Sequence, residues 1–283
     1  MTVPRPNLRI PRFTVSPLHE MREAGILAAR ARVELLDGVL VDMPRPTERE
    51  MEITRRVAEV LTERLGNATV QPGEPFHPEA YATFDPTLMV HDWETLPLTR
   101  PYRLHRFSVD EYRSLVEAGV LPSQNRYELL DGVVLEADPR RGRLRRRIEH
   151  AARLVRERVH SNIVRVREPV RLGPFSLLRP DVAVCRDRAD GYRVGPPRGE
   201  DVVLALDVAD DRADDISSLR WAVYARWEIR TTWLVDLQKS IVRVGQEPCR
   251  SDYARVETYR SGQTLRAPAA FADIVIGVGD LVG

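Results

Sequence analysis

The chain contains an internal repeat, and this repeat constrains the fold more than any other feature. Residues 13–90 align with residues 107–184 at a constant offset of 94 positions and without a gap. The best-matched stretch reads EAGILAARARVELLDGVL in the first copy and EAGVLPSQNRYELLDGVV in the second. Since repeated sequence folds into repeated structure, we expect a tandem duplication in which only the second copy is complete. The predicted layout is a basic, Pro-rich arm (1–12), a truncated copy (13–98) and a full domain (99–283).

The composition is that of an ordinary globular protein. Hydrophobic residues make up 43% and charged residues 30% of the chain, so a sizeable core can be buried. No apolar run approaches the ~20 residues of a membrane span, and the N-terminal residues lack the apolar core of a signal peptide. Two cysteines, Cys185 and Cys249, form no disulfide framework or zinc cluster. We therefore expect a cytoplasmic protein that does not contact a membrane.

The basic residues are almost all arginine. Of the 43 basic residues only Lys239 is a lysine, and the net charge is +1. A near-neutral chain has no overall attraction for nucleic acid, so a nucleic-acid site would have to be a local patch. Arginine stays protonated whereas lysine can be tuned into a base. A mechanism that needs a catalytic lysine therefore has a single candidate.

The second copy begins with three recognisable elements. Ser108 and Glu111 form a capping-box pattern at the start of a predicted helix. Asp131-Gly132 joins two apolar runs and predicts a β-hairpin. Apolar residues at helical spacing predict a second helix over about 144–159.

The later part of the chain alternates apolar strands with one further helix. Residues 201–208 (DVVLALDV) are almost all apolar and predict a strand buried on both faces. A helix is expected over about 216–229, followed by strands in TTWLVDL, SIVRV and YARVETY. The pattern predicts an α/β domain with one buried sheet flanked by helices.

Two aspartates lie beside apolar strands. Asp181 stands in RPDVAVC, and Asp207 lies at the end of the run VVLALDV, one residue before Val208. Two strands joined by a loop can lie side by side, which would bring these carboxylates together. Paired carboxylates can hold Mg²⁺ next to phosphate oxygens. The alternative is that each aspartate caps a turn at the end of its strand.

The order of these motifs resembles the Uma-two family of putative restriction endonucleases, within the PD-(D/E)XK nuclease superfamily. The resemblance covers about 104–283. It is carried by FSVDEYRSLVEAG, RYELLDGVVLE, LLRPDVAVC, VVLALDV, LRWAVYARWEIRTTWLVDL and FADIVIGVGDLV. It implies a restriction-endonuclease-like mixed sheet flanked by helices, here preceded by a truncated tandem copy of its N-terminal half.

The resemblance also implies a metal-dependent catalytic site. Asp181 and Asp207 would bind Mg²⁺ or Mn²⁺, and Glu128 of the hairpin would be a further ligand. Arg220 would take the position of the catalytic lysine and contact the phosphate. In such a site one or two metal ions activate water and stabilise charge on the scissile phosphate.

Several positions depart from the family pattern. Asp207 is one methylene shorter than the usual glutamate, and Arg220 cannot serve as a general base. Glu228 stands where a glycine normally ends the helix. Thr87 occupies the position of Asp181 in the first copy, so that copy cannot be an independent active site.

An arginine-rich stretch, PRRGRLRRRIEH, precedes and enters the second helix of the full copy. It could bind backbone phosphates without reading sequence, or it could be a solvated loop and helix face. The corresponding stretch of the first copy, PTEREMEI, is not basic. The arginines are Arg140, Arg141, Arg143, Arg145, Arg146 and Arg147.

Three tryptophans, Trp221, Trp227 and Trp233, could stack on bases. Their spacing along one helix and one strand favours packing in the core instead.

Two functions remain open. The first is a Mg²⁺-dependent DNA endonuclease of the restriction type. The second is an inactive nuclease-fold protein that binds nucleic acid or another protein. The truncated copy lacks central strands of its own, so we expect residues 13–98 to pack on the C-terminal domain as an intramolecular pseudo-dimer.

Overall fold

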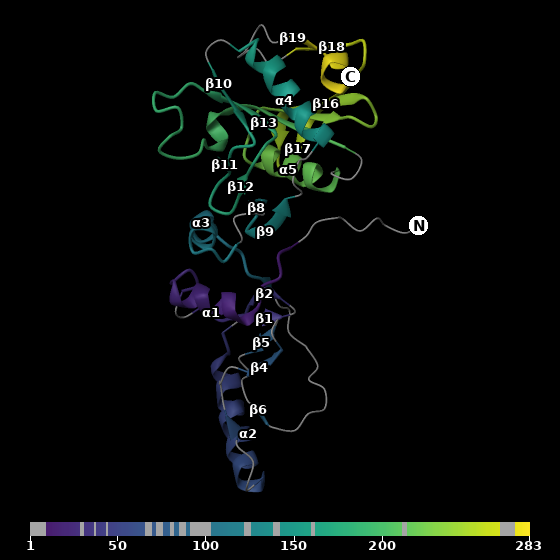
Figure 1. Ribbon diagram of the computed structural model, residues 1–283. Coiled ribbons are helices and arrows are strands. Elements are labelled where there is room, and N and C mark those ends of the chain that lie inside the picture. Colours follow the sequence, from purple (N-terminus) through teal and green to yellow (C-terminus); the bar gives the residue numbers. More distant parts are fainter. Residues whose placement is uncertain are drawn as a thin grey trace, which may run out of the picture. The chain divides into compact units, whose positions relative to one another are not determined.

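The computed structural model folds into two compact units (Figure 1). The C-terminal unit comprises Phe107–Tyr112 and Gln124–Gly283, and the N-terminal unit comprises Ile10–Arg106 and Arg113–Ser123. No helix in the described part of the chain has the length and apolar character needed to cross a membrane. The structure describes residues 10–28, 31–36, 38–43, 45–65, 70–71, 76–79, 82–84, 89–90, 103–121, 126–137, 142–159, 162–210, 214–266 and 275–283.

A mixed sheet forms the centre of the C-terminal unit, with the strand order β10-β13-β14-β15-β16-β17. β14 and β15 run parallel, and the other neighbouring strands pair antiparallel. β14 is buried along its whole length, as the apolar run predicts. The strands are β10 (Asn162–Val166), β13 (Val182–Arg186), β14 (Val202–Ala209), β15 (Thr231–Asp236), β16 (Ile241–Cys249) and β17 (Asp252–Arg260).

A second, smaller sheet contains the predicted hairpin. Asp131 and Gly132 join β8 to β9 with φ angles of 50° and 85°, which is the combination that a two-residue type I′ turn requires. The sheet has the order β11-β12-β8-β9, and β18 pairs with β19 separately. The strands are β8 (Arg126–Leu130), β9 (Val133–Ala137), β11 (Val170–Arg171), β12 (Leu177–Leu178), β18 (Thr264–Arg266) and β19 (Val275–Gly277).

Helices cover both faces of the central sheet (Figure 1). Alternate residues of β14 point to opposite faces, as expected of a strand. Leu206 packs with α4 and α6 on one face, and Ala205 packs with α5 and the smaller sheet on the other. The capping box of Ser108 and Glu111 is confirmed at the start of α3. The helices are α3 (Val109–Glu117), α4 (Gly142–Arg156), α5 (Asp214–Arg226), α6 (Val278–Val282) and a short 3₁₀ turn (Gly199–Asp201).

The N-terminal unit has elements of the same kinds in the same order. Its sheet has the order β4-β5-β1-β2-β7, and β3 pairs with β6. The helices and strands are α1 (Val15–Glu23), β1 (Val33–Leu36), β2 (Val39–Asp42), α2 (Glu48–Leu65), β3 (Val70–Gln71), β4 (Phe76–Glu79), β5 (Ala82–Phe84), β6 (Met89–Val90) and β7 (Arg103–Leu104).

Strand registers within the two units agree at the offset of the sequence repeat. Leu35 pairs with Thr83 in the N-terminal unit, and Leu129 pairs with Leu177 in the C-terminal unit. Val70↔Val90 likewise corresponds to Val164↔Val184. Each residue of the second pair lies 94 positions after its counterpart, so equivalent residues take equivalent backbone pairings.

Two features at the end of α5 differ from simple expectation. Trp221 and Trp233 are buried, but Trp227 is 38% exposed, so the prediction of core packing is wrong for Trp227. Trp227 directly follows α5, and its indole packs against Gly173. Glu228 adopts a left-handed φ of 56°, the conformation that favours glycine after a helix.

Candidate functional site

Two aspartates meet where β13 begins and β14 approaches its end. The register pairs Val182 with Leu206, which places Asp181 opposite Asp207. The Asp181 backbone N–H donates to Asp207 Oδ1 at 3.0 Å, and the Val208 N–H donates to Asp181 Oδ2 at 2.9 Å. The structure thus brings together the two carboxylates that the sequence singles out.

Glu128 and Arg220 complete the cluster from two other elements. Glu128 lies on β8 of the smaller sheet, and Arg220 lies on α5. Arg220 Nε donates to Glu128 Oε2 at 3.0 Å, and Nη2 donates to Glu128 Oε1. Arg220 Nη1 donates to Asp207 Oδ1 at 3.2 Å. One guanidinium therefore bridges two carboxylates, a use for which its planar fork is well suited.

Tyr224 and Arg167 also contact the cluster. Tyr224, one turn after Arg220 on α5, donates its hydroxyl to Asp207 Oδ2 at 3.1 Å. Arg167 Nε lies 3.8 Å from Asp181 Oδ1. Tyr224 could have been anticipated, because residues four apart share a helix face. Arg167 could not, because it lies in a loop with a left-handed φ of 54° and carries no motif.

The two titratable donors of the cluster, Arg220 and Tyr224, both stay protonated. Burial alone would lower the pKa of the Arg220 guanidinium, but the Glu128 and Asp207 carboxylates outweigh burial and keep that pKa well above its ordinary value. Burial, followed by the charge of Asp207, raises the pKa of Tyr224 well above its ordinary value. Arg220 therefore cannot accept a proton, and Tyr224 remains a hydrogen-bond donor.

The arrangement does not fit a divalent metal ion. Both oxygens of Glu128 and both of Asp207 already accept hydrogen bonds from protein donors, as does one oxygen of Asp181. Glu128 and Asp181 are 1% exposed and Asp207 is 2% exposed, which excludes the waters that usually complete the shell of Mg²⁺. Among the described residues, no group of three or more His, Cys, Asp or Glu could hold a metal ion.

The predicted arginine-rich patch lies partly on α4. Arg140 and Arg141 fall outside the described residues, and the side chain of Arg143 is also not described. Arg145 and Arg146 are exposed and Arg147 is half-buried, and Arg145 Nε pairs with Glu149 at 2.8 Å. We call the exposed side of α4 the α4 arginine face; it consists of Arg145, Arg146, Arg153 and Arg156.

The bridge made by Arg220 predicts a large loss of stability when this residue is truncated. Arg220→Ala leaves the Glu128 and Asp207 carboxylates buried without their cation, and we expect unfolding to become easier by about 3–5 kcal/mol. Urea denaturation of the full chain measures this change. Arg260→Ala, which removes an exposed arginine of β17, should change stability by less than about 0.5 kcal/mol. Equal stabilities of the two variants would contradict the assignment of Arg220 as the internal cation.

Two comparisons find similar proteins, and both are described as putative nucleases. A putative nuclease from Anabaena variabilis, belonging to the family DUF820, is similar to the chain with a TM-score of 0.49 and 13% identity. The alignment covers 62% of this chain and 97% of that chain. No curated protein matches the chain significantly. The model of the Uma2 family, described as putative restriction endonuclease, matches residues 109–279. The chain therefore belongs to the Uma2 family.

Proposed function

We propose that this protein uses its nuclease-type domain to bind nucleic acid, and that Arg220 holds the inherited catalytic centre closed. The main support for this proposal is that the buried guanidinium of Arg220 pairs with both Glu128 and Asp207. The positive charge of Arg220 lies among the carboxylates where the family resemblance implies Mg²⁺. In this state the carboxylates of Glu128, Asp181 and Asp207 are buried and not exposed to a metal ion from solution.

A second candidate function is a Mg²⁺-dependent or Mn²⁺-dependent DNA endonuclease. It is favoured by the approach of Asp207 from β14, Glu128 from β8 and Asp181 from the residue that precedes β13. In an open site Asp181 and Asp207 would hold the ion, Glu128 would assist, and Arg220 would contact the phosphate. The metal would supply Lewis-acid activation of water and of the phosphate. This function requires Arg220 to release both of its carboxylate partners.

A plasmid-nicking assay with Mg²⁺ or Mn²⁺ distinguishes the two functions. We expect no cleavage by the natural protein or by Asp181→Ala, because the carboxylate oxygens are engaged by protein donors. Arg220→Lys should gain cleavage and should bind Mn²⁺ in a calorimetric titration, since lysine cannot bridge two carboxylates as arginine does. Metal-dependent nicking by the natural protein that is lost in Asp181→Ala would establish the endonuclease instead.

The α4 arginine face is the surface that we propose contacts the nucleic-acid backbone. Its four arginines share the exposed side of α4 with one acidic residue, Glu149, while Ile148 and Val155 anchor the opposite side in the core. Such a surface binds phosphates without reading sequence. The cysteines Cys185 and Cys249 are free thiols, which suits the cytoplasm proposed as the location.

Salt dependence of DNA binding tests the α4 arginine face. Replacing Arg145 and Arg146 by alanine should weaken binding to duplex DNA and lower the slope of log K against log salt by about 2, at ~0.9 per phosphate contact. Fluorescence anisotropy at several salt concentrations measures the slope. The double variant Arg255→Ala/Arg260→Ala removes the same charge from β17 and should keep the natural slope. An unchanged slope in the α4 variant would exclude this face.

We further propose that residues 13–98 are a truncated duplicate of the following domain. The agreement of strand registers at an offset of 94 supports this origin. α2 leaves four large apolar side chains exposed, whereas the corresponding helix α4 buries its apolar side against β13 and β14. We propose that the apolar side of α2 is covered in an intramolecular pseudo-dimer. The exposed residues of α2 are Met51, Ile53, Val57 and Val60.

Charge substitutions on α2 test this pseudo-dimer. Ile53→Glu/Val57→Glu places two carboxylates in the proposed contact and should lower the free energy of unfolding by more than 1 kcal/mol, since buried charges without partners are costly. Arg49→Glu, on the same helix, should have an effect within about 0.5 kcal/mol. If the double variant is as stable as the natural protein, the apolar side of α2 is not covered within the chain.

A further inference from the structure

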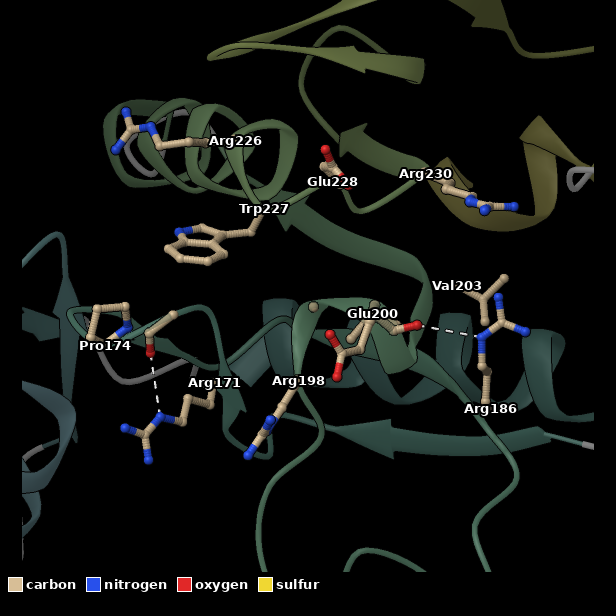
Figure 2. Close-up of a pocket in the computed structure, with 13 residues that line it drawn as sticks. Arg171, Pro174, Arg186, Arg198, Glu200, Val203, Arg226, Trp227, Glu228 and Arg230 are labelled. Carbon is tan, nitrogen blue, oxygen red and sulfur yellow. Dashed lines mark hydrogen bonds between the residues drawn. The ribbon is translucent and has the colours of Figure 1, made fainter.

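A second polar site lies at the other end of the central sheet. It is a pocket of about 870 Å³, bounded by the start of β14, the 3₁₀ turn, β11 and the end of α5 (Figure 2). Val203 of the pocket precedes Asp207 by four residues on β14, which is ~13 Å along a strand. The pocket is therefore separate from the buried carboxylate cluster.

Arginine dominates the lining of this pocket. Two acidic residues, Glu200 and Glu228, line the pocket together with five arginines. Asp110 and Asp131 pair with two of the arginines from outside the lining, and the described part of the chain provides no ion pair or side-chain hydrogen bond for Arg198 or Arg230. Both of these side chains are exposed. The pocket therefore carries uncompensated positive charge. The five arginines are Arg171, Arg186, Arg198, Arg226 and Arg230.

Three of the arginines are held in place by other groups. Arg171 donates to the Gly173 carbonyl at 3.3 Å and pairs with Asp110 at 3.3 Å. Arg186 donates to the Glu200 carbonyl at 3.4 Å. Arg226 pairs with Asp131. These contacts restrict the side chains, so binding a ligand costs less conformational entropy at these positions.

Backbone pairing places two arginines next to each other. Arg171 and Arg198 form an isolated parallel β-bridge, and the Arg171 N–H donates to the Pro197 carbonyl at 2.8 Å. Figure 2 shows their side chains leaving neighbouring segments on the same side of the pocket. Two adjacent guanidinium groups offer several donors to the oxygens of one phosphate.

Trp227 provides a flat apolar surface opposite these arginines (Figure 2). Its indole lies so close to Gly173 that a Cβ there would be 2.0 Å from the ring, and a Cβ at Gly199 would be 2.8 Å from the Trp227 carbonyl. Because glycine has no Cβ, the backbone at Gly173 and Gly199 can lie directly against Trp227. Because 38% of Trp227 remains exposed, part of the residue is open to a planar ligand.

The two glutamates indicate that the ligand is more than a bare anion. Glu200 and Glu228 are exposed beside the arginines, and each can accept hydrogen bonds from a sugar hydroxyl or an amino group. Glu228 also retains a left-handed φ of 56°, where glycine would be less strained. Strain of this kind is often found at binding sites.

We propose that this pocket binds a nucleoside phosphate, with the phosphate at Arg171 and Arg198 and the base against Trp227. Arg230 adds positive charge from the opposite wall. The same chemistry is present in a free nucleotide and in the 5′-phosphorylated end of a nucleic-acid strand. The site is independent of the α4 arginine face and of the carboxylate cluster.

Calorimetric titration of the full chain tests the pocket. AMP should bind more tightly than inorganic phosphate or adenosine, because the pocket offers partners to both halves of the ligand. Arg198→Ala/Arg230→Ala should weaken AMP binding at least tenfold, since charge-assisted hydrogen bonds are lost. Trp227→Ala should weaken AMP binding about tenfold through lost stacking and leave phosphate binding unchanged.

Matched variants and oligonucleotides complete the experiment. Arg260→Ala removes an exposed arginine outside the pocket and should bind AMP as the natural protein does. Binding of AMP assigns the site to free nucleotides, while binding of only 5′-phosphorylated oligothymidine assigns it to strand ends; both support the proposal. Failure of every phosphate probe to bind, or AMP affinity unchanged in Arg198→Ala/Arg230→Ala, would overturn it.

Discussion

The C-terminal unit depends on a buried positive charge, the guanidinium of Arg220. This side chain links α5, β8 and β14 by pairing with Glu128 and Asp207. Taking charges out of water costs several kcal/mol per ion, and only good geometry repays that cost. Here the geometry is good, because the hydroxyl of Tyr224 and the backbone of Asp181 satisfy the remaining oxygens of Asp207. The same contacts engage both oxygens of Glu128 and both of Asp207, which a metal ion would need as ligands.

A lysine at position 220 would have produced a different site. The compact ammonium group of lysine is a point charge on a flexible chain, whereas the guanidinium makes a planar, two-sided bridge. The bridge requires both carboxylates to turn toward the arginine and away from solvent. We therefore propose that the identity of the side chain at position 220 decides whether the cluster is a structural ion network or a site for a cation from solution.

Much of the architecture could be predicted from local sequence signals. The turn at Asp131-Gly132 and the cap at Ser108 follow from backbone chemistry that acts over a few residues. The apolar run of β14 likewise predicts its burial. The meeting of Asp181 with Asp207 could be anticipated as a possibility, but the register that produces it depends on the pairing of whole strands.

Other parts of the site could not be predicted from the sequence. The engagement of the carboxylate oxygens depends on side-chain directions, and no motif encodes those directions. Trp227 follows helical spacing, yet it lies beyond the last turn of α5 and emerges from the core. The basic pocket draws its arginines from five separate segments, so no local cluster in the sequence indicates it.

One helix connects the two ends of the C-terminal domain. α5 carries Arg220 in its middle and Tyr224 in its last turn, and Trp227 follows the helix and lies against Gly173 and Gly199. The acidic cluster and the arginine-lined pocket therefore share one structural support, the packed helix α5.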